Sequence, residues 1–153
     1  IRYRTGDISG LNPEKCTCGR TTVRMRRVRG RVDDMLIIRG VNVFPSQVES
    51  VLLRSKEVAP HYIIEVNRKG RMDEMNVRVE VTQDLMDHLA AKVLTTDLKA
   101  FAQEEEALIR IKSEIQKNIK DIIGLTTDIT LVPPGAVQRS EGKAKRVIDN
   151  RPK

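Results

Sequence analysis

Three short segments carry residue types that could do chemistry. The first is Tyr3-Arg4-Thr5-Gly6-Asp7, where a strand-like end runs into a turn and presents the Asp7 carboxylate. A carboxylate has two acceptor oxygens and suits a vicinal diol such as that of a ribose. The same residues also have a local explanation, because Thr and Asp bond nearby backbone groups in turns and Gly permits a tight bend.

The second segment runs from Gly30 to Glu49 and opens with Gly30-Arg31-Val32-Asp33-Asp34. A turn, a buried strand over 35–38, a second turn over 40–43 and a helix opened by Pro45 account for most of it. The Ser46-x-x-Glu49 spacing predicts a capping box for that helix. Arg31 and Asp33 concentrate charge where the composition of the chain changes, and a linker between two modules would lie there.

The third segment is Arg139-Ser140-Glu141-Gly142-Lys143-Ala144-Lys145-Arg146-Val147. A solvated basic tail is the ordinary interpretation of such a run. The functional interpretation is a loop that bends at Gly142 and presents one lysine to a phosphate, because an ammonium is a compact point charge. Lys143 follows the glycine directly, and Lys145 is its rival.

Two cysteines stand close together in Cys16-x-Cys18-Gly19. A metal site needs about four ligands, and the two histidines, His61 and His88, are far away in the sequence. We therefore favour a tight turn with reduced thiols. A metal site remains an alternative if residues outside this chain supply the other ligands.

Composition limits the classes of function. The chain has 153 residues with 28 Lys and Arg against 21 Asp and Glu, which gives a formal charge of +7. Six arginines between Arg20 and Arg31 suit nucleic acid, but an aromatic content of 3% leaves few platforms for base stacking. No stretch approaches the roughly 18 apolar residues of a membrane span. Without a secretory signal at Ile1, we expect a cytoplasmic protein, and without an initiator Met a piece of a longer one.

The elements that position these segments follow from periodicity. The pattern of residues 1–29 predicts a strand at 1–3 and a basic strand at 21–29. Two such strands cannot bury a core alone, so we expect residues 1–29 to be an appendage. From residue 35 the predicted order is β-α-β-β-α-α-β, an α+β domain with helices on one face of a sheet. The strands are expected at 35–38, 61–66, 75–81 and 128–132, and the helices from Pro45, from a capping Asp84 to about Leu94, and from Asp97 to Gly124. One apolar stripe of the last helix is expected in the core: Phe101, Leu108, Ile111, Ile115, Ile119 and Ile122.

The three segments together resemble the C-terminal part of the adenylate-forming acyl-CoA ligases. Ile37-Ile38-Arg39-Gly40-Val41-Asn42-Val43-Phe44-Pro45-Ser46-Gln47 and the Ser140–Val147 run are similar to the phenylacetate-CoA ligase branch, and Cys16-x-Cys18-Gly19-Arg20 fits it too. Only residues 85–106 match no motif. The resemblance implies that residues 1–32, a β-hairpin-like remnant, end a large N-terminal AMP-binding domain. Residues 33–153 would form the mobile C-terminal lid domain.

The resemblance also implies roles for single residues. Asp7 would hold the ribose hydroxyls of ATP, Arg31 would contact the nucleotide, and Asp33 would be the hinge. Lys143 would be the catalytic lysine of adenylation, and the loop at Gly40 would face CoA, the co-substrate. Mg²⁺ would be held mainly by the missing domain, which would also bind the carboxylic acid, of aryl-acetate type.

Two departures and several alternatives remain. Asn42 stands where much of the superfamily has Arg, and Glu141 stands where many members have Ser before Gly142-Lys143. The rival functions are an adenylylating synthetase of the coenzyme deazaflavin type that forms no thioester, a basic nucleic-acid-binding module and a small-molecule regulatory domain. The particular acid and the oligomeric state, including a homodimer, stay open.

Overall fold

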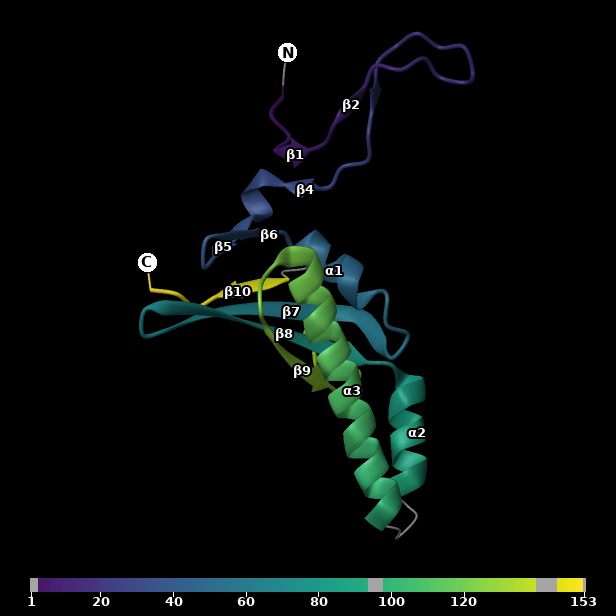
Figure 1. Ribbon diagram of the computed structural model, residues 1–153, viewed down its shortest axis with the longest axis vertical. Coiled ribbons are helices and arrows are strands. Elements are labelled where there is room, and N and C mark those ends of the chain that lie inside the picture. The colour runs from purple at the N-terminus through teal and green to yellow at the C-terminus, as the bar shows by residue number, and fades with distance from the viewer. Residues whose placement is uncertain (1–2, 94–97, 140–145, 153) are drawn as a thin grey trace.

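A four-stranded sheet forms the centre of the chain. The computed structural model describes the backbone of residues 3–93, 98–139 and 146–152, and the side chains of these residues except 92–105 (Figure 1). The strands β7 (Val58–Lys69) and β8 (Met72–Val81) form a long antiparallel hairpin that turns at Gly70. β9 (Asp128–Val132) lies parallel to β8, and β10 (Val147–Asp149) lies parallel to β7, so the order is β10-β7-β8-β9. The predicted α+β class and the 75–81 strand are confirmed.

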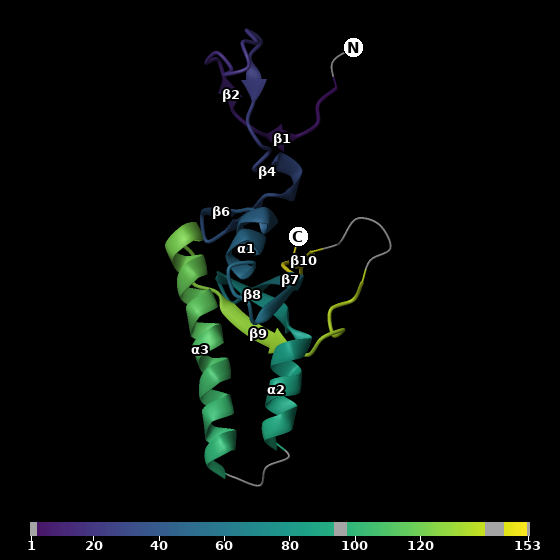
Figure 2. The same cartoon turned by 90° about the vertical axis from the view of Figure 1, so that its right-hand side faces the viewer.

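The helices α1 (Pro45–Leu52) and α3 (Leu98–Ile123) pack against this sheet, and α2 (Gln83–Val93) packs against α3. α2 and α3 lie side by side and extend beyond the sheet, as both views show (Figures 1 and 2). The alternating residues of β7 and β8, among them Ile64 and Val77, are fully buried against the helices. Burial of these apolar side chains is the main favourable contribution to folding.

The apolar stripe of α3 is confirmed in part. Ile111, Ile115 and Ile119 are buried, and Gly124 ends the helix with a φ of 80°. Ile122 was assigned to the core wrongly: it is 41% exposed, and Ile123 is buried instead. The buried face follows steps of four residues from Ile111, so the next position inside is 123. The side chain of Phe101 lies outside the described residues, as do Leu94 and Asp97.

The sequence-based boundaries of the strands were wrong in two places in this part of the chain. Residues 40–43 are not a turn: β5 (Leu36–Ile38) and β6 (Val41–Val43) pair across a turn formed by Arg39 and Gly40, with φ of 51° and 78°. Positive φ at both positions is the geometry that closes two-residue hairpins. β10 was missed inside the basic tail, because its three residues are held by parallel pairing with β7, which is 83 residues away at Val147 and Ile64.

The predicted helix caps were also shifted. The N–H of Phe44 donates to Gln47 Oε1 at 3.1 Å, so Gln47 supplies the reciprocal bond expected of Glu49. At α2 the N–H of Leu85 donates to Thr82 Oγ1 at 3.3 Å, which makes Thr82 the cap instead of Asp84. Within the described residues, none of the helices has the length and apolarity to cross a membrane.

The N-terminal residues form an interrupted hairpin that projects from the domain (Figures 1 and 2). Its strands are β1 (Asp7–Ile8), β2 (Leu11–Asn12), β3 (Arg24–Met25) and β4 (Gly30–Arg31), with β2 paired to β3 and β1 to β4. The continuous strand predicted over 21–29 was wrong, because no third strand or core face supports it. None of residues 3–37 is buried, and Leu11 and Met25 are 71% and 68% exposed. The predicted strand at 1–3 is not seen at Tyr3, and residues 1–2 lie outside the described range.

Candidate functional site

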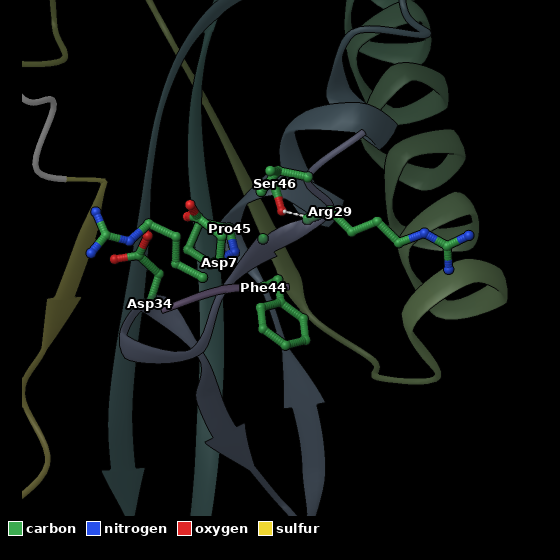
Figure 3. Close-up of a pocket in the computed structure, with 9 residues that line it drawn as sticks. Asp7, Arg29, Asp34, Phe44, Pro45 and Ser46 are labelled. Carbon is green, nitrogen blue, oxygen red and sulfur yellow. Dashed lines mark hydrogen bonds between the residues drawn. The ribbon is translucent and has the colours of Figure 1, made fainter. Parts of the chain in front are cut away.

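A pocket of about 310 Å³ lies where the N-terminal hairpin meets α1 (Figure 3). Its lining comes from both parts of the chain: Asp7, Val28, Arg29, Gly30, Arg31, Asp34, Phe44, Pro45 and Ser46. A second cavity of about 430 Å³ shares Arg29, Gly30, Phe44 and Ser46 with it. The two are therefore adjoining hollows of one junction, with charged groups only on part of its wall.

Asp7 and Arg31 are brought together across this junction. They are 24 positions apart in sequence, yet they are direct partners in the antiparallel pairing of β1 with β4. The N–H of Val32 donates to the carbonyl of Gly6 at 2.8 Å, which continues the pairing past Arg31. The sequence-based assignment of both residues to one nucleotide site is thus geometrically consistent, since both line the same pocket.

Asp33 lies in the short 3₁₀ helix Val32–Asp34 that directly follows β4. Arg31 donates twice to it, from Nε to Oδ1 at 3.0 Å and from Nη2 to Oδ2 at 2.7 Å. These bonds and the charge of Asp33 raise the pKa of the Arg31 guanidinium. The Arg31 and Asp33 side chains are 39% and 59% exposed, so water screens this pair and a competing anion could displace Asp33.

Two contacts close the junction between the hairpin and α1. Ser46 Oγ donates to the carbonyl oxygen of Arg29 at 2.9 Å, while the Arg29 side chain is directed away from the pocket (Figure 3). At Gly30 an added Cβ would lie 3.1 Å from Phe44 Cδ1, so only a glycine lets this strand approach the ring without displacement. The sequence reasoning assigned Ser46 to a helix cap and gave Phe44 no role. The spacing of motifs carries no signal for such a long-range contact.

Of the other two predicted site residues the structure describes one, Gly40, and it lies away from this pocket. Gly40 lies at the exposed tip of the β5–β6 hairpin, four residues and so about 13 Å along the strand from Phe44, with open space beside it. Lys143 lies outside the described residues. The described segments on either side of it do have defined partners.

On the N-terminal side the partner is Glu80, a carboxylate at the end of β8 that is 1% exposed. Glu80 Oε1 accepts from the N–H of Val137 at 2.8 Å, and Oε2 accepts from Arg139 Nη2 at 2.8 Å. Burial alone would raise the pKa of Glu80, but these bonds, with one from the Gly135 backbone, outweigh it and hold the pKa below its usual range. Glu80 thus fixes the stretch that leads into residues 140–145.

The cysteine pair forms a tight turn, as predicted. The N–H of Gly19 donates to the carbonyl of Cys16 at 2.9 Å, and Gly19 has a φ of 85°. The two sulfur atoms are 3.1 Å apart, and a bond from the Cys18 backbone lowers the pKa of Cys16. In the part of the chain that the structure describes, no three His, Cys, Asp or Glu residues gather as a metal site would require.

Comparison with protein families gives a match over residues 40–151 to the AMP-binding enzyme C-terminal domain. The phenylacetate-coenzyme A ligase of Thermus thermophilus is 48% identical over 152 residues, which cover 99% of this chain and 34% of that protein. The chain therefore spans about a third of the length of this curated relative.

Among solved structures, a 2-hydroxyisobutyryl-CoA ligase in the postadenylation state matches with a TM-score of 0.73 and 28% identity, over 95% of this chain and 28% of that one. The same ligase with CoA in the thioesterification state gives a TM-score of 0.62. A domain of phenylacetate-coenzyme A ligase from Bacteroides vulgatus gives 0.60 at 37% identity, over 78% of this chain and 95% of that one.

Proposed function

Since this chain belongs to the family of AMP-binding enzyme C-terminal domains, we propose that it is the C-terminal part of an AMP-forming acid–CoA ligase. Residues 1–32 end the large AMP-binding domain, and residues 33–153 form the small mobile domain. The acid is of the aryl-acetate type, which the name of the 48% identical relative supports.

One observation carries the proposal: Asp7, Arg31 and Asp33, taken from two separate sequence segments, converge at a single junction. Asp7 faces Arg31 across the β1–β4 pair, and Arg31 holds Asp33. A pocket lined by a carboxylate and a guanidinium offers an acceptor for ribose hydroxyls and a donor for phosphate oxygens.

In the first half-reaction a carboxylate oxygen of the acid attacks the α-phosphorus of ATP. An O–P bond forms, the bond to the β-phosphate oxygen breaks, and pyrophosphate leaves. Both reactants are anions, so Lys143, placed between them, stabilises the charge that builds in the transition state. An ordinary solvated lysine is charged at pH 7, so this role requires no proton transfer. Asp7 fixes the ribose, and Arg31 exchanges Asp33 for the nucleotide.

Mg²⁺ is expected to arrive with the triphosphate. The described residues offer no cluster of three ligands for it, so it would be held by phosphate oxygens and by residues outside this chain. No step proposed for the residues of this chain depends on it.

In the second half-reaction the small domain rotates about Asp33 and brings the β5–β6 hairpin with Gly40 toward CoA. The thiol sulfur attacks the acyl carbon, a thioester forms, and AMP leaves. The higher TM-score to the postadenylation state than to the thioesterification state supports assigning the present arrangement to adenylation. One mobile domain then serves two steps in turn.

The experiment uses the full-length protein with ATP, phenylacetate and CoA. We expect AMP, pyrophosphate and phenylacetyl-CoA in equal amounts. Accumulation of the acyl-adenylate with no CoA consumed would instead indicate an adenylylating enzyme that forms no thioester. Absence of pyrophosphate with phenylacetate and with a panel of other carboxylic acids would contradict the proposal.

A further inference from the structure

Arg146 is not a solvated tail charge, although it ends the basic run of the sequence. Its carbonyl oxygen accepts from the N–H of Ile64 at 2.8 Å, which fixes its backbone beside β7. Its guanidinium lies 5.0 Å from the centroid of the Tyr62 ring and donates from Nη1 to Tyr62 Oη at 3.2 Å. The same guanidinium forms an ion pair with Glu49. Three different interactions therefore hold one side chain.

These contacts lead directly to the pocket. Tyr62 Oη donates to the carbonyl of Pro45 at 3.0 Å, and Pro45 lines the pocket beside Asp7. Glu49 lies one turn further along the same helix, α1. Two contacts thus connect Arg146 to the wall of the proposed nucleotide site.

The environment of this cluster favours a fixed geometry. Tyr62 is 3% exposed, and burial raises its pKa to about 12, so the phenol stays protonated and can donate. The hydrogen bond that Arg146 donates to Glu49 raises the pKa of the Arg146 guanidinium. The planar guanidinium can stack on the ring and donate at its edge at the same time, which a lysine cannot do.

We infer that Arg146 is a positioning residue for adenylation: it fixes the C-terminal end of the 140–145 segment to the α1 wall of the pocket without contacting substrate. Three residues of chain span at most about 10 Å, so whatever fixes Arg146 limits where Lys143 can go. The inference rests on the proposed function, in which Lys143 serves the first half-reaction only.

The test compares Arg146→Ala, Arg146→Lys and Tyr62→Phe in the full-length protein. Adenylation is measured as pyrophosphate release from ATP and phenylacetate, and the second step as thioester formation from preformed phenylacetyl-AMP and CoA. We expect Arg146→Ala to lower kcat of adenylation about 10- to 100-fold, the scale for a misplacement of about 1 Å. The KM for ATP should change less than about 3-fold, because Arg146 does not touch the nucleotide.

The thioester step of Arg146→Ala should stay within about 2-fold of the parent rate, because the second step does not use Lys143. Arg146→Lys should recover part of the adenylation rate by keeping the charge opposite Glu49. Tyr62→Phe keeps the aromatic ring and should lower the adenylation rate less than Arg146→Ala does.

Arg68→Ala is the matched control. Arg68 donates to Asp73 at 2.8 Å near the far end of the β7–β8 hairpin. Its loss removes an ion pair of the same kind elsewhere in the sheet and should leave both steps near the parent rates. Equal losses of both steps in Arg146→Ala, or parent-like adenylation, would overturn the inference.

A readout independent of activity separates this inference from the proposed function. Trypsin cleavage of the Lys143–Ala144 bond in the full-length protein, followed by mass spectrometry, should be several-fold faster in Arg146→Ala than in the parent and unchanged in Arg68→Ala. Faster cleavage in Arg146→Ala, together with a parent that shows no adenylation with any acid, would retain the positioning role of Arg146 and reject the proposed function. Unchanged cleavage in Arg146→Ala would reject the positioning role of Arg146.

Discussion

Glu80→Gln is predicted to destabilise the chain because Glu80 is the buried carboxylate that holds the stretch before Lys143. The change keeps the size of the side chain but removes its charge. At 1% exposure, an amide group in place of the carboxylate must turn its NH₂ toward either the Val137 N–H or Arg139, and both are donors. One of the two bonds is therefore lost and the other is weakened.

The magnitude follows from the exposure of the two partners. The bond to Val137 is buried, and an unsatisfied backbone donor costs about 1–3 kcal/mol. Arg139 is 51% exposed and can turn to water, so its share is about 1 kcal/mol or less. We expect a loss of about 2–3 kcal/mol in the free energy of unfolding at pH 7. For a chain of this size that corresponds to a fall in Tm of roughly 4–12 °C.

The assay is urea unfolding followed by circular dichroism at several pH values. The folded-state pKa of Glu80 is lowered below its unfolded value, so its contribution is present above the unfolded pKa of about 4.3 and is lost as pH falls through the folded pKa. The difference between parent and variant should be largest at pH 6–8 and should shrink below about pH 4. Glu74→Gln, an exposed change on the same face of β8, is the control. Equal effects of Glu80→Gln and Glu74→Gln, or a parent–variant difference that grows at low pH, would contradict this role of the Glu80 carboxylate.

Three further outcomes are expected. The isolated 153-residue chain should release no pyrophosphate from ATP and phenylacetate in a direct assay, because it spans only about a third of its relative. Asp33→Pro in the full-length protein fixes φ near −65° and should slow thioester formation more than adenylation, whereas Asp33→Ala, which loses the Arg31 pair but keeps a free φ, should not show this split. Ile119→Ala should lower the free energy of unfolding by about 2–5 kcal/mol, since Ile119 is fully buried. Ile122→Ala, exposed on the same helix, should cost far less in the same urea titration.

The elements with strong local signals were predictable from sequence. β8 alternates Met75, Val77 and Val79 on one face, so it was found with its buried face. α3 was found with most of its buried face, except that Ile122 was chosen at its end instead of Ile123. Local periodicity fixes which side of an element is apolar. It does not fix what covers the other side.

Contacts between distant segments were the ones that sequence could not supply. Glu80 sits on the polar face of its strand by alternation, yet residues 133–139 cover it, and only the fold shows that a carboxylate there is buried. Arg146 belongs by sequence to a basic tail, but Tyr62 and Glu49 hold it. The motif residues Asp7, Arg31 and Asp33 were found only because the three segments were considered together through a resemblance.

The central claim is that Lys143 serves adenylation within a small domain that performs two steps. The measurement is the rate of pyrophosphate release from ATP and phenylacetate by the full-length Lys143→Ala variant, beside its rate of thioester formation from preformed phenylacetyl-AMP and CoA. We expect a fall of about 10²-fold or more in the first rate, the scale for loss of one preorganised partner of the developing charge, and a nearly unchanged second rate. Lys145→Ala should be mild in both. Loss of adenylation in Lys145→Ala but not in Lys143→Ala would show that Lys145 has this role instead of Lys143. Parent-like rates in both variants would contradict the catalytic claim.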